Sequence, residues 1–335
     1  MRAAQQTTER PADIWTGIAS RQGTLVRILS TRDPQALAEY LDHAPEHPVL
    51  QGVLQDDIET GMLRRSGQYR RLKSQIAVDR FVSLMECIGS LAVQNPEQGP
   101  WGTRRELDGQ TLLRDLDRYC GVEVVVPQVF RGLFVVEIAG RLFNTVDLMA
   151  INSALKIRKI LAGSARKSLL EIGAGSGRTA YWCLRFGLGP IGIIDLPHVA
   201  IAQAWYLAKA MPEVGLQLYG ETSNADAMVS IYPDFALAQV PAEPLGLVFN
   251  QDSFPEMSKS AVIQYLDWIA ASDARLLLSI NHESGAATAF GTQLNFSALA
   301  TTAGYVSIER QRNWIRRGYV DELFSVSRRP RKLGV

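Results

Sequence analysis

The stretch LLEIGAGSGRTA, residues 169–180, decides the fold of this chain. A short apolar run with one acid, Glu171, leads into a loop that contains Gly173, Gly175 and Gly177. Glycines at this spacing allow a sharp turn, and they let a ligand approach the backbone N–H groups at the start of a helix. The pattern E-x-G-x-G-x-G differs from the G-x-G-x-x-G of dinucleotide-binding proteins. The stretch therefore predicts a buried strand, a ligand-binding loop and a helix that begins at Arg178.

An acid ends the next predicted strand, IGIIDL, residues 191–196. Asp195 follows Gly177 by about the length of one helix and one strand, so it belongs at the tip of that second strand. A carboxylate there can accept hydrogen bonds from both hydroxyls of a ribose. The glycine loop and Asp195 together predict a ligand that contains a nucleoside. The alternative is a tight turn followed by an acid that only caps the next helix.

Strands and helices alternate around this loop. Helices are predicted within 145–161, from Arg178, within 199–211 and within 260–270, and the segment between residues 220 and 246 is read as a loop. The predicted strands are SLLEIG (168–173), IGIIDL (191–196), LQLYG (216–220), GLVFN (246–250), ARLLLSIN (274–281), YVSIER (305–310) and YVDELFSVSR (319–328). Such alternation predicts a mostly parallel sheet covered on both faces. The last strand is expected to be antiparallel, because no helix separates it from the strand before it.

The first 144 residues have a different pattern. DPQALAEYLDHA (33–44) has an Asp cap followed by Pro, and residues 69–93 carry apolar side chains at three- and four-residue spacing, so both predict helices. Residues 122–142 contain β-branched runs and predict a small hairpin that turns at Arg131-Gly132. We therefore divide the chain into a mainly helical cap or dimerisation region, 1–144, and a catalytic domain, 145–335. A homodimer through the helical region is one expected assembly.

The composition excludes several classes of function. The chain has 335 residues, 47% of them apolar, and a net charge of only +1, which argues against nucleic acid or a membrane surface as the main partner. The basic tail Arg328, Arg329, Arg331 and Lys332 is interpreted as a solvated end. Three widely spaced cysteines predict free thiols, not a disulfide framework or a zinc site. With no signal peptide or membrane span in the sequence, we expect a cytoplasmic protein.

LLEIGAGSGRTA followed by IIDLPHV (193–199) resembles the cofactor half of class I S-adenosylmethionine-dependent methyltransferases. The resemblance extends from about residue 169 to the C-terminus. It implies a Rossmann-like methyltransferase fold, S-adenosyl-L-methionine as the cofactor and S-adenosyl-L-homocysteine as its product. By position it places Gly173, Gly175 and Gly177 along the methionine part of the cofactor and Asp195 at the ribose.

The same resemblance implies roles for two further residues, and the position of Arg178 gives an independent indication. Leu196 would pack against the adenine, and Glu171 would organise the loop and the cofactor's amino group. Arg178 lies in the first turn of a helix, where a cation opposes the helix dipole, so an anion such as the cofactor carboxylate would explain it. The alternative for Arg178 is a side chain that extends to solvent.

The phrase NQDSFPEM, residues 250–257, indicates the kind of methyltransferase. Methyltransferases that act on phenols carry His-Asp-Trp after the fourth strand, whereas this chain has Asn250-Gln251-Asp252 there. NQDSFPEMSKSAVIQYLDWI, together with LLLSINHES (276–284), is similar to the sugar O-methyltransferases of bacterial polysaccharide and natural-product clusters. This resemblance implies methyl transfer to a hydroxyl of a sugar or of a glycosylated small molecule. The alternatives are a phenol or amine methyltransferase and a partner protein that binds the cofactor without chemistry.

Methyl transfer to an alkyl hydroxyl requires a base within hydrogen-bond reach. His282 is the first candidate, because its titration range suits a base and it follows a strand that ends near the site. Asp252 and Glu256 compete with it. Glu256 has an alternative role, a capping box with Ser253 at the start of a helix. The Asp252–Glu256 pair has another, holding Mg²⁺ against vicinal sugar hydroxyls, although no metal site is favoured.

Several other residues complete the predicted site. Asn250 is placed beside the cofactor, and Asn250 and Asn281 end neighbouring strands, where amides can orient hydroxyls. His198 is expected to start a helix beside the adenine. Three aromatic residues could stack on a ligand but more often belong to a core: Trp101, Tyr181 and Trp205.

Overall fold

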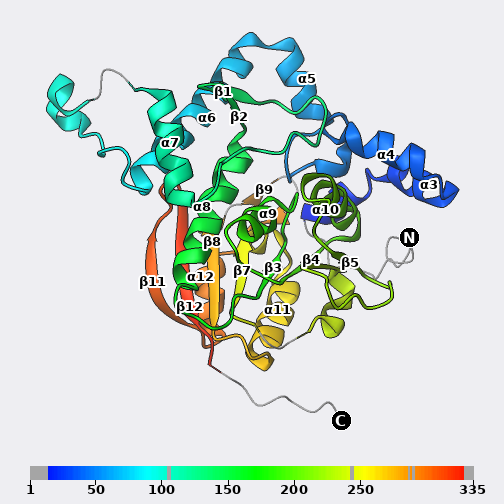
Figure 1. The fold of residues 1–335 in the computed structure, drawn as a ribbon. Coiled ribbons are helices and arrows are strands. Elements are labelled where there is room, and N and C mark those ends of the chain that lie inside the picture. The colour runs from blue at the N-terminus through cyan, green and yellow to red at the C-terminus, as the bar shows by residue number, and fades with distance from the viewer. Residues whose placement is uncertain (1–13, 104–106, 242–244, 286, 289–290, 328–335) are drawn as a thin grey trace.

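The computed structural model describes residues 14–103, 107–241, 245–285, 287–288 and 291–327 (Figure 1). The first 13 residues and the basic tail from Arg328 lie outside the described residues, so the interpretations of both ends stay predictions. The helices and 3₁₀ turns are α2 (Ile14–Ala19), α3 (Gly23–Thr31), α4 (Pro34–Asp42), η1 (Ala44–Glu46), η2 (Pro48–Leu50), α5 (Asp57–Arg65), α6 (Gly67–Cys87), η3 (Pro96–Gly102), α7 (Gly109–Cys120), α8 (Thr145–Ile160), α9 (Arg178–Arg185), α10 (Pro197–Ala210), η4 (Asp234–Gln239), η5 (Phe254–Glu256), α11 (Lys259–Ala271) and α12 (Phe296–Thr302).

The described strands form one large sheet and two small hairpins. They are β1 (Val136–Ile138), β2 (Arg141–Phe143), β3 (Leu169–Ile172), β4 (Ile191–Asp195), β5 (Leu216–Leu218), β6 (Val229–Pro233), β7 (Leu247–Gln251), β8 (Leu276–His282), β9 (Ala287–Thr288), β10 (Gly291–Thr292), β11 (Val306–Arg312) and β12 (Tyr319–Ser325). The large sheet has the order β11-β12-β8-β7-β3-β4-β6-β5. All its pairs are parallel except those of β12, which is antiparallel to both β8 and β11. This topology confirms the predicted Rossmann-like fold, including its antiparallel last strand.

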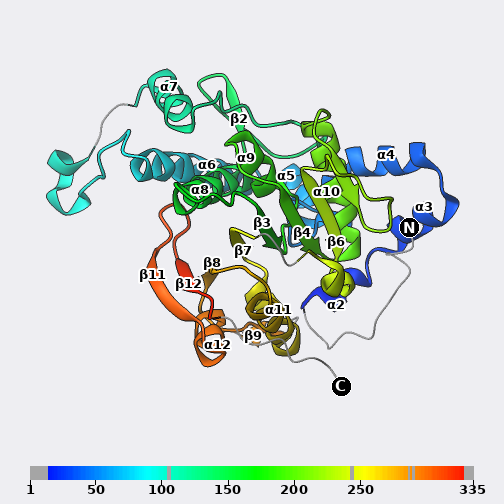
Figure 2. The ribbon, with the colours of Figure 1, turned by 60° about the horizontal axis from the view of Figure 1, so that its bottom comes forward.

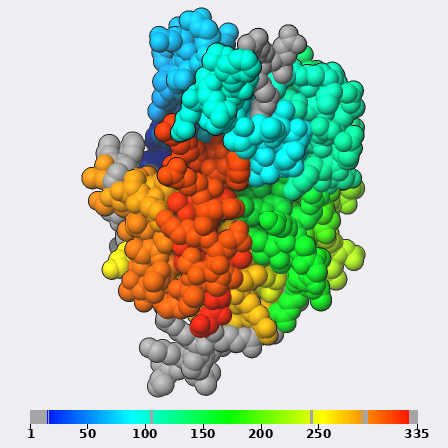
Figure 3. All heavy atoms as spheres, turned by 90° about the vertical axis from the view of Figure 1, so that its left-hand side faces the viewer, coloured from blue at the N-terminus to red at the C-terminus, as the bar shows by residue number. Residues whose placement is uncertain are grey.

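The two faces of this sheet bury different cores, because successive side chains of a strand point to opposite faces. Leu169 of β3 packs with α8, α9 and α10 on one face, and Leu170 packs with α11 and α12 on the other. Figure 2 shows the sheet between these two helical layers. At one edge, every residue of β11 is exposed, and its orange-red atoms lie on the surface in Figure 3. Helices cover both faces of the sheet, and the carboxyl ends of its parallel strands meet at one edge.

The helical N-terminal region forms largely as predicted. Asp33 caps α4 and accepts hydrogen bonds from the N–H groups of Gln35 and Ala36, and α8 begins at Thr145 after the cap Asn144. The hairpin occupies only the last part of the predicted range: it pairs β1 with β2 and turns at Ala139-Gly140, not at Arg131-Gly132. The earlier half of the predicted hairpin has no strand, because its β-branched residues pack into the core as an extended segment that Pro127 interrupts.

The predicted loop between residues 220 and 246 contains a strand. β6, VSIYP, lies between β4 and β5 in the sheet, and β5, which contains part of LQLYG, is the edge strand. The sequence did not predict this strand, because a Pro within a short run argues against a central strand. In the structure Pro233 is the last residue of β6, where a missing N–H removes no interior ladder bond.

Within the described ranges, no helix has both the length and the apolar character required to cross a membrane. The three cysteines are free, and two of them, Cys120 and Cys183, are buried. Burial raises the pKa of the Cys120 thiol to about 12, as expected of a structural thiol that stays protonated.

Candidate functional site

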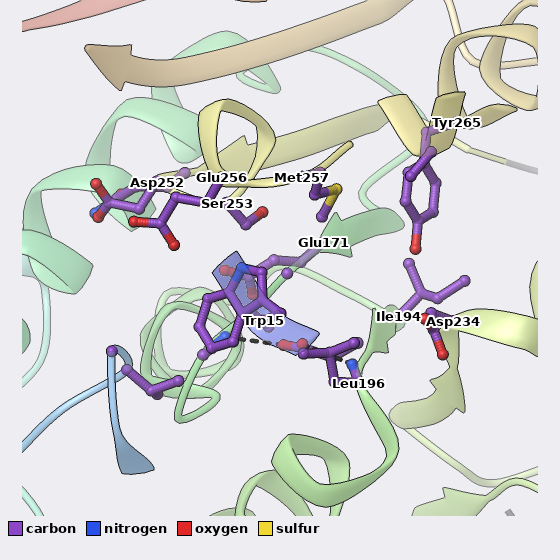
Figure 4. A pocket seen from close by; sticks show the side chains of 18 of the residues that line it. Trp15, Glu171, Ile194, Leu196, Asp234, Asp252, Ser253, Glu256, Met257 and Tyr265 are labelled. Atoms are coloured by element: carbon purple, nitrogen blue, oxygen red, sulfur yellow. Dashed lines mark hydrogen bonds between the residues drawn. The ribbon is translucent and has the colours of Figure 1, made fainter. Parts of the chain in front are cut away.

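A cavity of about 490 Å³ lies at the carboxyl ends of β3, β4, β6 and β7. This is the place where open α/β sheets bind ligands. The glycine loop, the end of β4, the turn after β6 and the segment from Gln251 to Tyr265 all contribute to its wall. Figure 4 shows side chains from these separate elements pointing into one space. The sheet topology therefore brings together residues that are far apart in the sequence.

The three glycines of the loop all have positive φ angles, of 69°, 58° and 78° for Gly173, Gly175 and Gly177. A Cβ atom on Gly173 would lie 2.1 Å from Ser253 Oγ, and one on Gly175 would lie 3.2 Å from Val53 Cγ1. Side chains are therefore excluded for both conformational and steric reasons. The loop forms a cradle whose backbone faces the cavity.

Asp195 is buried at the tip of β4 and lines the cavity, as predicted. Its Oδ2 accepts hydrogen bonds from the Gly175 N–H (3.1 Å) and from Gln203 Nε2 (2.6 Å), and its Oδ1 accepts one from the Leu196 N–H (2.7 Å). A carboxylate offers about four acceptor positions, so one position on Oδ1 stays free for a ligand hydroxyl. Burial raises the pKa of Asp195 to about 7.

Glu171 is buried within β3, and its side chain lines the same cavity. Its Oε2 has no hydrogen-bond partner among the described residues, while the Thr179 hydroxyl hydrogen-bonds its carboxyl group. Burial, followed by the hydrogen bond and the neighbouring Asp195, leaves the pKa of Glu171 raised to about 8. An unpartnered buried carboxyl oxygen is costly unless a ligand donor satisfies it, so Glu171 fits a cationic ligand group.

Arg178 is 1% exposed, so the alternative that it extends to solvent is wrong. Its Nε donates to Asp147 Oδ1 of α8 (2.6 Å), and its Nη1 donates to Ser176 Oγ of the glycine loop (2.9 Å). The guanidinium also lies 4.5 Å from the centre of the Tyr206 ring. Its charge already has a partner in Asp147, so a role toward a cofactor carboxylate is not required to explain it and stays a prediction.

Apolar side chains line the cavity near β4, beside the carboxyl groups of Asp195 and Asp234. Ile194 and Leu196 lie there with Phe235 of the turn after β6 and Tyr265 of α11 (Figure 4). Leu196 therefore lines the cavity, and its packing against an adenine stays a prediction. His198 is the second residue of α10, as expected for a residue that starts this helix.

Asn250 does not line the cavity, although it was predicted to lie beside the cofactor. It is fully buried, and its Nδ2 donates to Ile172 O (2.8 Å) and Ser253 Oγ (2.5 Å). Its Oδ1 accepts a hydrogen bond from Asn281 Nδ2 (2.9 Å). The two strand-end amides therefore bind each other, and Asn250 also binds the end of β3. Neither side chain lines the cavity.

The capping box predicted for Ser253 and Glu256 is absent. Ser253 has helical φ and ψ angles and accepts no capping hydrogen bond, because η5 is only a short 3₁₀ turn. α11 starts later, at Lys259, and Ser258 is its cap, accepting from the Ala261 N–H. Glu256 is thereby free to line the cavity. Burial, and next the nearby Asp252, raises the pKa of its carboxyl group to about 7.

Asp252 also lines the cavity, in a left-handed conformation with φ of 67°. Its carboxylate forms an ion pair with Arg316 from the loop between β11 and β12. Its N–H donates to Ile280 O of β8 at 3.2 Å. Because its charge already has a partner, Asp252 is a weaker candidate for the base than Glu256.

His282, the first candidate for the base, does not line the cavity. It is the last residue of β8, and its Nδ1 lies 3.1 Å from Ser284 Oγ. Its ring packs edge-on against Tyr319, with ring centroids 5.6 Å apart. Burial lowers the pKa of His282. The ring faces the β12 side because Tyr319 pairs with His282 across the strands, which the sequence did not indicate.

Metal binding has no support among the described residues, which contain no group of three or more His, Cys, Asp or Glu residues suited to hold an ion. Three residues of the helical region were missed as parts of the site: Trp15, Gly52 and Val53, all of which line the cavity. No periodicity or motif in the sequence connects them to the glycine loop, since the contact arises only from tertiary packing. Trp101, in contrast, is 94% exposed and outside the site.

Comparisons with solved structures find chains of similar fold. The mitomycin 7-O-methyltransferase MmcR is 15% identical, with a TM-score of 0.39, and the match covers 55% of this chain and 55% of that chain. The CcbJ methyltransferase from Streptomyces caelestis is 13% identical, with a TM-score of 0.39, and the match covers 53% of this chain and 89% of that chain. At such identities the similarity concerns the fold alone. No protein-family model and no curated protein matches the chain.

Proposed function

We propose that this protein is an S-adenosylmethionine-dependent O-methyltransferase that acts on a hydroxyl of a sugar or of a glycosylated small molecule. The observation that carries the proposal is the position of Glu256. This carboxyl group faces the same cavity as the glycine cradle, Glu171 and Asp195 (Figure 4). One cavity thus combines groups suited to a nucleoside cofactor with a group suited to remove a proton.

The residues of the cavity fit the cofactor. The unpartnered Oε2 of Glu171 suits an ammonium group, the free acceptor position of Asp195 suits a ribose hydroxyl, and Leu196 suits an adenine face. The backbone cradle at Gly173 and Gly175 suits a ligand that approaches closely. When bound, the cofactor would supply an activated methyl group on its sulfonium.

Glu256 is the residue proposed to accept the proton of the acceptor hydroxyl. With a pKa of about 7 it is both partly ionised near neutral pH and a better proton acceptor than an ordinary carboxylate. Ser258, Ser260 and Gln264 line the cavity on the same segment. Such neutral hydrogen-bonding side chains can bind several hydroxyls at once, which favours a sugar acceptor.

Titration with S-adenosylhomocysteine tests the cofactor site. Asp195→Ala should raise the Kd by about 5- to 150-fold, corresponding to about 1 to 3 kcal/mol for a buried hydrogen bond and its partners. Asp267→Ala is the control, because Asp267 lies on α11 and does not line the cavity. Absence of saturable binding to folded wild-type protein would contradict the proposal.

Glu256→Gln tests the base. It should lower kcat by about 10²- to 10⁴-fold, the usual contribution of a general base, while the Kd of S-adenosylhomocysteine stays near the wild-type value. The control Glu309→Gln changes an exposed glutamate of β11 and should leave both quantities unchanged. Full activity of Glu256→Gln on a sugar acceptor would remove Glu256 from this role.

A second candidate function is methylation of an amine. Five carboxyl groups line the cavity, those of Glu171, Asp195, Asp234, Asp252 and Glu256, and they would favour a cationic acceptor over an anionic one. A panel of matched acceptors, a glycoside and the corresponding amino glycoside blocked at its hydroxyls, separates the two functions. Turnover of the blocked amine would favour the amine.

A further inference from the structure

Arg316, from the C-terminal pair of strands, contacts a residue that lines the cavity. It belongs to the loop between β11 and β12, which lies beside the carboxyl end of β8, and its guanidinium pairs with Asp252. The guanidinium also stacks on Tyr319, with Cζ 3.6 Å from the ring centre. Arg316 is thus held on two sides, by an aromatic face and by the carboxylate of a residue that lines the cavity.

The loop that carries Arg316 is itself anchored. The Arg316 N–H donates to Asn313 Oδ1 at 2.8 Å, and Asn313 Nδ2 donates to Asp321 Oδ1 at 2.7 Å. Asp321 is 3% exposed and pairs in turn with Lys156 of α8. A series of polar contacts therefore connects α8 with the loop between β11 and β12. These contacts fix the backbone at Arg316, from which the guanidinium reaches Asp252.

Asp252 has a backbone conformation that is unusual for a residue other than glycine. A residue other than glycine in the left-handed region is unfavourable by roughly 1 to 2 kcal/mol, and Asp is among the side chains that tolerate it best. The conformation directs the Asp252 carboxylate to the cavity wall near Glu256, as Figure 4 shows. Asp252 raises the pKa of Glu256, and Arg316 lowers it. The two charges thus act on the proposed base with opposite signs.

We propose that Arg316 is a positioning residue: its pairing with Asp252 holds two opposite charges beside Glu256, and together they control the protonation state of the base. The inference deepens the proposed function, on which the role of Glu256 as base rests. Arg316 itself does not line the cavity. Its effect reaches the reacting hydroxyl only through the protonation state of Glu256.

Other charged and titratable groups surround this cluster and belong to its electrostatics. Arg80 of α6 lies near Arg316, and burial together with Arg316 lowers the pKa of Arg80 to about 10. Tyr319 hydrogen-bonds Asp252, and His282 is influenced by both members of the ion pair. The ion pairs among the described residues do not include Arg80, whose Nη1 donates to Thr145 O. The guanidinium groups of Arg80 and Arg316 therefore both lie near the Asp252 carboxylate.

The test follows the Glu256 carboxyl group directly by ¹³C NMR of protein labelled at the glutamate carboxyl carbons. The Glu256 signal is assigned by its loss in Glu256→Gln. Arg316→Met should raise the titration midpoint and Asp252→Asn should lower it, each by about 0.5 to 1 pH unit for the removal of one nearby, partly screened charge. The acidic limb of the kcat–pH profile should move in the same directions.

Two variants control this experiment. Arg316→Lys keeps the charge and should keep the midpoint near that of wild type, and Arg317→Met removes the adjacent, exposed arginine and should change nothing. A purely structural role for Arg316 would give losses of activity without midpoint shifts of opposite sign. Unchanged midpoints in both Arg316→Met and Asp252→Asn would overturn the inference.

The NMR midpoints and the turnover separate this inference from the proposed function. Shifted midpoints in a protein that methylates no acceptor would support the positioning role and contradict the methyltransferase. Turnover with unshifted midpoints would do the reverse. Should Arg316→Met fail to fold, Arg316→Gln takes its place, because it also removes the charge and should give the same rise of the midpoint.

Discussion

Glu171 and Glu256 face one cavity from different elements, and each lacks an ion-pair partner among the described residues (Figure 4). Burial raises the pKa of both, to about 8 and about 7. Because a raised carboxyl pKa marks a site where the negative charge is destabilised, both residues favour a ligand that brings a positive charge or a hydrogen-bond donor. At the scale of single residues, the cavity therefore suits a ligand with a cationic or hydrogen-bond-donating group.

The raised pKa of Glu171 makes the stability of the free protein depend on pH. A carboxyl group whose pKa is higher in the folded state stabilises the fold fully at pH values below its pKa in the unfolded chain, about 4.5. This stabilisation is lost as the pH rises to the folded-state pKa of about 8. Glu171→Gln removes the ionisation. We expect its melting temperature, relative to wild type, to increase progressively from pH 5 to pH 8.

Thermal unfolding across this pH range, without cofactor, measures the difference. Glu309→Gln, at an exposed position, should follow the wild-type curve at every pH. A difference between Glu171→Gln and wild type that is constant with pH would show that Glu171 does not titrate in this window. Binding of S-adenosylhomocysteine should also release protons from wild type near pH 7, because an ammonium group beside Glu171 favours its ionised form.

At the scale of elements, the glycine cradle depends on a contact between two strand ends. Gly173 follows β3, and Ser253, which Asn250 holds in place, follows β7. Gly173→Ala adds a methyl group that would lie 2.1 Å from Ser253 Oγ and 2.5 Å from Ser253 Cβ, at a φ of 69°. We expect a loss of stability above the roughly 1 to 2 kcal/mol of the left-handed conformation alone, and weaker S-adenosylhomocysteine binding.

Gly187→Ala separates the two causes. Gly187 also has a positive φ, of 75°, but an added Cβ there has no atom within 4 Å, so only the conformational cost applies. The double variant Gly173→Ala, Ser253→Gly removes both clashing atoms and should recover part of the stability. Denaturant unfolding and calorimetric titration check these expectations. Equal losses for Gly173→Ala and Gly187→Ala would mean that Ser253 does not restrict the loop.

The sequence predicted elements best where local patterns determine them. The strand β3, the glycine loop, the start of α9 at Arg178 and the acid that ends β4 follow from spacing and turn chemistry, and all have their expected places. The strand β6 was missed because Pro233 obscured it. Asn250 and His282 were misplaced because strand-end position does not tell which way a side chain points. Trp15 and Val53 were missed because only tertiary packing brings them to the cavity.

At the scale of the whole molecule, the predicted boundary at residues 144–145 does not divide the core. One cluster of buried side chains joins Leu50 and Leu116 of the helical region with Leu169 of β3 and Tyr206 of α10. Val53 reaches from the same region to the glycine loop. Residues on both sides of the boundary therefore share one interior, and the cavity at the glycine loop has walls from both.

This shared interior predicts that the protein unfolds in a single cooperative transition, which S-adenosylhomocysteine moves upward as a whole. Leu116→Ala, in the fully buried part of α7, should lower the free energy of unfolding by about 2 to 5 kcal/mol, the usual effect of a core leucine deletion, and should shift that same transition. Leu72→Ala on α6 is the control, because Leu72 is 50% exposed. Scanning calorimetry with and without the ligand measures all three proteins. Two separate transitions, with Leu116→Ala shifting one and the ligand shifting the other, would mean that the helical region folds independently of the cavity that it helps to line.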